Sequence, residues 1–193
     1  VSRWEALCQH GVPNYFGPQR FGPEGRNLQR AEALLNRGWR KRDDRQGMML
    51  STARSFLFNE LLSARIADGT WSQPLAGDTL MQDGIQSVFR IDASDHTLQA
   101  RAAELDVHPT GVLWGVGEAD QDDAAGYEAR LLEHYPGLCS GLQRSGVKQA
   151  RRALRMRLLE PQYAWESGAV RLSFSLPRGS FATAVLGELM LAN

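Results

Sequence analysis

The chain has 193 residues, 42% of them hydrophobic, which is enough to bury the core of one generous domain or two small ones. Its 22 Lys and Arg residues balance 22 Asp and Glu residues, so net charge alone gives no reason to expect nucleic acid or a membrane surface as a partner. The sequence shows no secretory leader, no apolar run of membrane-spanning length and only two cysteines, Cys8 and Cys139, and we therefore expect a cytoplasmic protein with reduced thiols.

The chain starts at Val1, inside a segment, SRWEALCQH, that has the pattern of a helix. We therefore expect it to be a piece of a longer protein.

The next stretch, GVPNYFGPQRFG at 11–22, is the least ordinary part of the sequence. Its polar and aromatic side chains suited to nucleic acid are Asn14, Tyr15, Phe16, Gln19, Arg20 and Phe21. Amides can read base edges, a guanidinium can pair with phosphate, and an exposed aromatic ring can contribute about 1–3 kcal/mol of stacking per base. Two interpretations stay open: these rings contact a planar partner, or they are the core of a loop that folds back on its own domain.

Helical periodicity is clearest over 51–67, with Ser51 as the expected cap. Weaker helical patterns cover 27–37, 96–106, 121–134 and 145–154. Between them, the glycine-punctuated residues 70–95 predict a small hairpin. PTGVLWGVG is expected to form a turn with an apolar core.

After about residue 155 the pattern changes to the alternation of strands. LRMRLLEPQYAW and residues 170–176 predict an antiparallel pair connected at Gly168. A turn, Ser180 as a helix cap and an apolar final helix are expected to follow.

Basic residues recur in two clusters, RKRDDR at 40–45 and RRALRMR at 151–157. In the first, Asp43 and Asp44 offset half of the positive charge, which fits a solvated loop. The second has four basic residues in seven and none acidic, and predicts a stripe along a phosphate backbone, with Arg151, Arg152, Arg155 and Arg157 as candidate contacts.

Other chemistry has little support in the sequence. The four histidines lack metal-ligand spacing, and the acidic residues of EADQDD fit a helix start better than a calcium loop, so no metal is expected. No phosphate loop or complete dinucleotide fingerprint occurs, and no nucleotide cofactor is expected.

Four segments, in this order, resemble the TruD family of tRNA pseudouridine synthases: GVPNYFGPQRFG, LSTARSFLFNELLSARI, PTGVLWGVG and LPRGSFATAVLGEL. The resemblance implies an enzyme that isomerises uridine to pseudouridine in tRNA, at position 13 of the D arm in bacterial members, through a covalent Asp nucleophile and without a cofactor. It implies an α+β fold in which residues 1–10 end one portion of the catalytic domain. Residues 11–156 would form a helix-rich inserted TRUD domain with a small hairpin, and 157–193 the last strands and helix of the catalytic sheet.

The resemblance also implies site residues. The loop at 14–21 would lie beside the catalytic cleft, and Arg54 and Asn59 match polar positions of the second motif. Ser180, Phe181 and Thr183 match the C-terminal motif, whose helix start would border the uridine pocket.

The nucleophilic Asp of the family lies in a Gly-x-Lys-Asp motif, which is absent from this sequence. We therefore expect no catalytic residue in this chain, which alone should be inactive and should have tRNA and a missing N-terminal catalytic half as partners. A non-catalytic RNA-binding module is the main alternative, and a helical protein-interaction domain ranks third.

Overall fold

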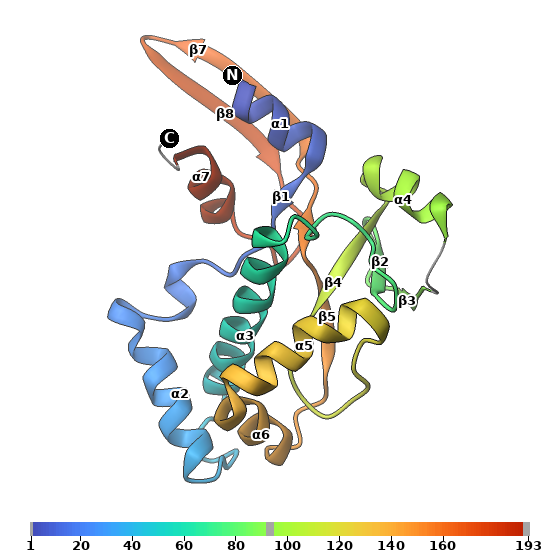
Figure 1. Ribbon diagram of the computed structural model, residues 1–193. Helices are drawn as coiled ribbons and strands as arrows, with labels where there is room; N and C mark the ends of the chain where they lie inside the picture. Colours follow the sequence, from blue (N-terminus) through green and yellow to red (C-terminus); the bar gives the residue numbers. More distant parts are fainter. Residues whose placement is uncertain (1, 92–94, 191–193) are drawn as a thin grey trace.

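The computed structural model describes residues 2–91 and 95–190, which form a mixed fold of helices and antiparallel strands (Figure 1). The helices are α1 Ser2–His10, α2 Arg26–Asn36, α3 Met48–Ala67, α4 His96–Ala103, α5 Asp122–His134, α6 Pro136–Arg144 and α7 Ala182–Met190, with short 3-10 helices η1 Pro18–Arg20 and η2 Pro23–Gly25. The strands are β1 Val12–Pro13, β2 Thr79–Gln82, β3 Val88–Arg90, β4 Val107–Leu113, β5 Ala150–Ala153, β6 Arg155–Met156, β7 Leu159–Glu166 and β8 Ala169–Ser175.

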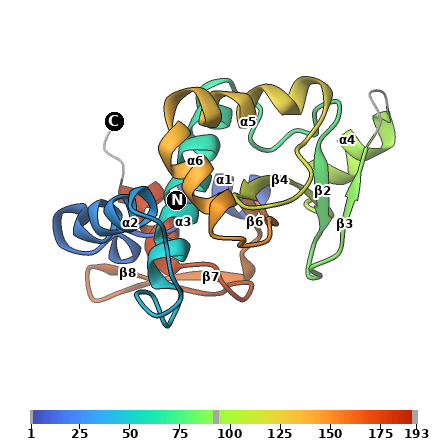
Figure 2. The same cartoon turned by 90° about the horizontal axis from the view of Figure 1, so that it is seen from below.

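The largest core lies where α2, α3, α5 and α6 gather beside β4 and β5 (Figures 1 and 2). β4 is central in a four-stranded sheet of order β3-β2-β4-β5. α3 crosses this sheet at Gly111, where an added Cβ would lie only 2.9 Å from Phe58 and from Leu154. A glycine in mid-strand therefore lets the helix approach the sheet closely.

Helix α3 begins earlier than its periodicity indicates, at Met48, and Ser51 lies inside it. The cap comes from Asp44, whose carboxylate accepts hydrogen bonds from the backbone N–H groups of Met49 and Leu50 at 3.1 Å each. The expectation that Ser51 caps this helix is therefore wrong, because the buried carboxylate of Asp44, four residues before Met48, accepts from the first free N–H groups of the helix.

Two further sequence expectations are wrong. Residues 145–154 form a turn and strand β5, and the helix in this region is α6, which ends at Arg144. Most of PTGVLWGVG belongs to the buried strand β4, and Pro109 and Gly111 lie within the sheet and not in a turn. The other predicted helices and both predicted hairpins are confirmed.

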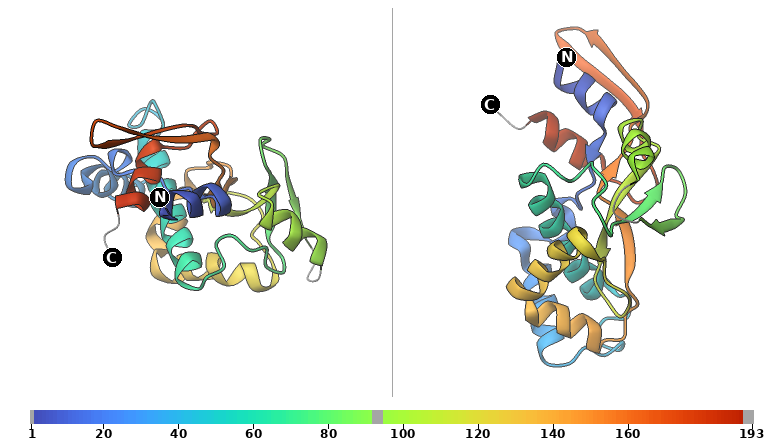
Figure 3. Two further views of the ribbon diagram at one scale, coloured as in Figure 1. Left: turned by 90° about the horizontal axis from the view of Figure 1, so that it is seen from above. Right: turned by 45° about the vertical axis from the view of Figure 1, so that its right-hand side comes forward.

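The two ends of the chain share a second core. β1 pairs with β6, and Trp4 and Leu7 of α1 pack with residues of β8 and α7, including Phe174 at a ring distance of 5.8 Å. α1 lies along the β7–β8 hairpin, which extends to one end of the molecule (Figure 3). Ser167 and Gly168, with φ of 50° and 81°, form its two-residue turn, whose positive φ values are those of a type I′ turn.

Candidate nucleic-acid interface

The loop that follows β1 is held against α3 by Asn59. The Asn59 side chain accepts a hydrogen bond from the backbone N–H of Phe16 at 2.9 Å and donates one to its carbonyl at 3.0 Å. The Phe16 ring contacts Phe58 edge-on at 5.6 Å and lies 6.0 Å from Phe181. The ring of Phe16 therefore packs against protein on these sides, which favours the core interpretation for this aromatic.

Arg152 joins this loop to the C-terminal segment. Its guanidinium lies 4.0 Å from the centre of the Phe16 ring and donates to both the carbonyl and the side-chain oxygen of Asn14, the latter at 2.7 Å. A further nitrogen donates to the carbonyl of Gly179 at 2.8 Å. Burial, with a smaller contribution from the charge of Arg20, lowers the pKa of Arg152 to about 10.

Asn14 is itself buried and completes the junction. Its side-chain nitrogen donates to the carbonyl of Ala153 at 2.9 Å, and its oxygen also accepts from the hydroxyl of Ser180 at 3.2 Å. Ser180 therefore does not act as the expected cap; it lies two residues before α7 and holds Asn14 instead. Asn14, Arg152 and Ser180 come together from three distant parts of the chain.

The remaining residues of the aromatic loop lie around this junction. Arg20 is half-buried, donates to the Ser51 hydroxyl at 3.0 Å and lies 5.5 Å from the Phe16 ring. Tyr15 shares a hydrogen bond with Ser63 at 2.9 Å. Gln19 is exposed and Phe21 is half-buried.

Arg151 points away from Arg152 and into the interior. It forms 2.7 Å ion pairs with Asp120 and Glu128, while Asp120 accepts from Thr79 at 2.8 Å. Burial raises the pKa of Glu128, although the Arg151 charge opposes the shift. Neighbouring side chains of an extended strand point to opposite sides, which separates these two arginines.

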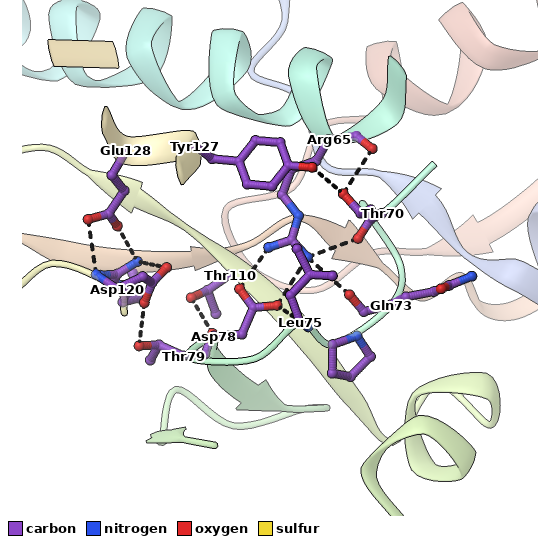
Figure 4. Close-up of polar contacts among 12 residues, drawn as sticks. Arg65, Thr70, Gln73, Leu75, Asp78, Thr79, Thr110, Asp120, Tyr127 and Glu128 are labelled. Carbon is purple, nitrogen blue, oxygen red and sulfur yellow. Dashed lines mark hydrogen bonds and ion pairs between the residues drawn. The ribbon is translucent and has the colours of Figure 1, made fainter. Parts of the chain in front are cut away.

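Beside this cluster lies a second buried pair, Arg65 and Asp78, joined at 2.7 and 3.0 Å (Figure 4). Arg65 also donates to the carbonyls of Thr70 and Gln73, and Asp78 accepts from the backbone N–H of Leu75. These charged groups fix the segment between α3 and β2 to the sheet.

Arg155 is also buried, 3% exposed, and lies apart from the Asn14 junction. It donates to the carbonyls of Ala102 and Val107 and, at 3.1 Å, to Nδ1 of His108. Nε2 of His108 lies 2.8 Å from Asp83. Because Nδ1 accepts from Arg155, the proton of a neutral His108 is on Nε2, where it donates to Asp83.

Two other predicted residues have different surroundings. Arg54 donates to the carbonyls of Leu113 and Lys148, both at 3.0 Å, and burial lowers its pKa. Arg157 is half-exposed and lies 3.6 Å from Asp83. The four arginines of the predicted stripe therefore do not form one continuous line, because their segment is a strand rather than part of a helix.

A groove of about 720 Å³ lies over the β5–β6 segment. It is lined by the β2–β3 turn, by residues of β5 and β6 and by the turn at 176–180, and includes five arginines: Arg151, Arg152, Arg155, Arg157 and Arg178. Sequence reasoning missed Arg178, for which the only signal was a basic residue beside Gly179 in a turn motif.

A second groove, of about 680 Å³, lies on the other side of the aromatic loop. Tyr15, Phe16, Trp71 and Thr183 line it, together with His10 and Glu188. Burial raises the pKa of Glu188. The exposed Thr183 therefore belongs to this groove and not to the arginine-lined one.

Among the described residues, no three His, Cys, Asp or Glu side chains are placed to hold a metal ion. Cys8 and Cys139 are free thiols, and burial raises the pKa of Cys139 to about 12. No helix within the described ranges has the length and apolar character needed to cross a membrane.

Comparison with known proteins gives consistent matches. The family model described as tRNA pseudouridine synthase D (TruD) matches residues 26–189. A tRNA pseudouridine synthase D of Chromohalobacter salexigens is 51% identical over 190 residues, covering 97% of this chain and 55% of that protein. The corresponding protein of Psychrobacter arcticus is 43% identical over 205 residues, covering 95% of this chain and 51% of its own length. The chain thus spans about half the length of these relatives.

A crystal structure from Methanosarcina mazei, of a protein described as a candidate tRNA pseudouridine synthase D (TruD), has a similar fold. It superposes with a TM-score of 0.70 at 20% identity, covering 100% of this chain and 64% of that one.

Proposed function

Because the chain belongs to the TruD family of tRNA pseudouridine synthases, we propose that it is the RNA-binding C-terminal part of an enzyme that converts uridine to pseudouridine at position 13 of the tRNA D arm. One observation carries this proposal: the Arg152 guanidinium joins the loop after β1 to the turn before α7, at the edge of a groove lined by arginines. Three segments that match family motifs or a predicted basic cluster thus meet at one surface.

The nucleophile is proposed to lie outside this chain. The buried carboxylates Asp78, Asp120 and Glu128 pair with arginines, and Asp44 caps α3, so each has a structural role. A carboxylate already paired with a guanidinium in a closed interior is a poor candidate for attack on a ribose or base.

The three hydrophobic cores of the described residues support a division into two domains. Residues of α1, β1 and the segment after 155 share one core, while 26–154 contribute to the other two. We assign 1–10 and 157–193 to a catalytic domain and 11–156 to the inserted TRUD domain. The cleft between them would receive a uridine that has left its stack, which costs a few kcal/mol.

The missing catalytic half is the proposed protein partner. Large apolar side chains are exposed on the β7–β8 hairpin and on α7, among them Trp165 at 67% and Met190 at 78%. In the described residues β7 and β8 pair only with each other, so each has a free backbone edge. Further strands of a catalytic sheet could pair there and cover these side chains.

Tritium release from tRNA labelled at carbon 5 of uridine tests the proposal. The samples are this chain alone, the N-terminal half of the Chromohalobacter relative alone, and a fusion of that half to this chain. A fusion in which the Asp of the donor's Gly-x-Lys-Asp motif is changed to Asn is the control. We expect release from the unaltered fusion only.

Each other outcome has a distinct meaning. Release by this chain alone would place a nucleophile among its own residues and refute the proposed location. An inactive fusion with salt-sensitive tRNA binding would favour the non-catalytic RNA-binding module, and no tRNA binding by any sample would reject an RNA function.

A further inference from the structure

The arginines of the groove differ in how many donors they have free. Arg151 is held by two carboxylates, Arg152 by Asn14 and Gly179, and Arg155 by His108 and two carbonyls. A guanidinium whose donors are satisfied inside the protein gains little by binding a phosphate. Three of the five groove arginines are therefore structural.

Arg178 has a different environment. Its side chain is exposed and, within the described residues, has no hydrogen bond or ion pair. It occupies the second position of a turn in which the N–H of Ser180 donates to the carbonyl of Pro177 at 3.1 Å. Gly179 follows with φ of 84°, the positive value that the third position of a type II turn requires.

The turn that carries Arg178 is fixed by hydrogen bonds to the buried junction of Asn14, Arg152 and Ser180. Arg152 donates to the carbonyl of Gly179 at 2.8 Å, and Ser180 donates to Asn14. The backbone on both sides of the turn is therefore tied to the buried junction, while the guanidinium of Arg178 lines the groove without a partner among the described residues. Little backbone entropy remains to be lost when this side chain binds a ligand.

We propose that Arg178 binds a backbone phosphate of tRNA in this groove, and that Arg152 positions the turn without contacting RNA itself. The inference rests on the proposed function and names the binding residue for it. A planar guanidinium with free donors suits the bidentate geometry of a phosphodiester. Arg157, whose only ion pair in the described residues is with Asp83 at 3.6 Å, lines the same groove as a weaker second cation.

The test measures binding of an unmodified tRNA transcript to this chain across a range of KCl concentrations. Arg178→Ala should weaken binding about five- to eightfold at 0.1 M salt and lower the slope of log K against log salt by about 0.7–0.9, the contribution of one phosphate contact. Arg178→Lys should retain the slope, because it keeps the charge. Arg144→Ala, at an exposed arginine at the end of α6 outside the groove, should leave both quantities unchanged.

Failure of the inference is distinguishable from failure of the function. Salt-dependent binding that Arg178→Ala leaves unchanged, or that Arg144→Ala weakens equally, would overturn the role of Arg178 and leave the RNA function standing. A wild-type chain that binds no tRNA at any salt concentration would overturn both.

Discussion

Asn59 lies in the middle of α3 and holds the backbone of Phe16 through both ends of its amide. Asn59→Ala removes both hydrogen bonds and leaves a partly buried N–H and carbonyl without their partner. We expect the free energy of unfolding to fall by about 1–3 kcal/mol. Urea denaturation measures the change, and Gln143→Ala, at an exposed helix position, is the control expected to have no effect. Equal stability of the two variants would show that water replaces Asn59 at no cost.

His108 is expected to make stability depend on pH. Burial is the main cause that lowers its pKa below 6.5, and Arg155 and Arg157 act in the same direction while Asp83 opposes them. The unfolded chain therefore binds this proton more readily, and the free energy of unfolding should fall as the pH drops from 6.5 through the lower folded-state pKa.

Urea unfolding at pH 7.5 and 5.5 checks this expectation. Wild type should lose more stability on acidification than His108→Gln, with the difference at most about 1.4 kcal/mol per pH unit for one proton. His96→Gln, at an exposed histidine, should behave as wild type. An identical pH response in wild type and both variants would show that His108 does not contribute; His108→Asn is a second substitution if the first does not fold.

The start of α3 depends on one of two adjacent aspartates. Asp44 accepts from the N–H groups of Met49 and Leu50 and from the indole of Trp39 at 3.1 Å, whereas Asp43 is exposed. Asp44→Ala should therefore lower the free energy of unfolding by about 2 kcal/mol, the upper end for a lost helix cap, because the indole N–H of the partly buried Trp39 also loses its partner. Asp43→Ala should cost almost nothing. Thermal and urea unfolding of the two variants make the comparison, and similar losses would argue against the cap.

Elements with a strong local pattern could be predicted from the sequence, whereas those that depend on distant partners could not. The helix over 51–67 and the strand over 170–176 each show a periodic pattern of apolar residues that is visible in the sequence alone. β5 is rich in Ala and Arg, which suit a helix, and it is a strand because its backbone pairs with β4 some 40 positions upstream. β4 contains Pro109 and Gly111, ordinary turn residues whose place in the sheet depends on packing with α3 and Leu154.

The same reasoning applies to the candidate site. The sequence could indicate that Asn14, Arg152 and Ser180 matter, but not that they contact one another, because their contacts span the chain. Reading 151–157 as a helix-to-strand transition suggested one stripe of arginines. A strand instead sends Arg151 and Arg152 to opposite sides, where Arg151 pairs with Asp120 and Glu128 and Arg152 with Asn14.

The distribution of exposed apolar groups over the molecule is uneven, with many of them on the β7–β8 hairpin and α7. If the missing catalytic half covers this surface, Trp165→Ser should weaken co-purification with the N-terminal half of the Chromohalobacter relative at least tenfold, since a large buried aromatic often dominates an interface. Leu132→Ser, at a 47% exposed position on α5, is the control and should leave the yield unchanged. Undiminished capture by the Trp165 variant would place the interface elsewhere.

The junction built by Arg152 also bears on how the chain folds. Asn14 and Arg152 are separated by 138 residues, and closing so long a loop costs entropy that grows as about (3/2)RT ln n. Contacts between neighbours such as α2 and α3 close much shorter loops and are expected to form first. The turn that carries Arg178 would then take its place only in a chain that has finished folding. Affinity for tRNA through this groove should therefore appear in the last kinetic phase of refolding. Partly folded chains would then not bind tRNA through this groove.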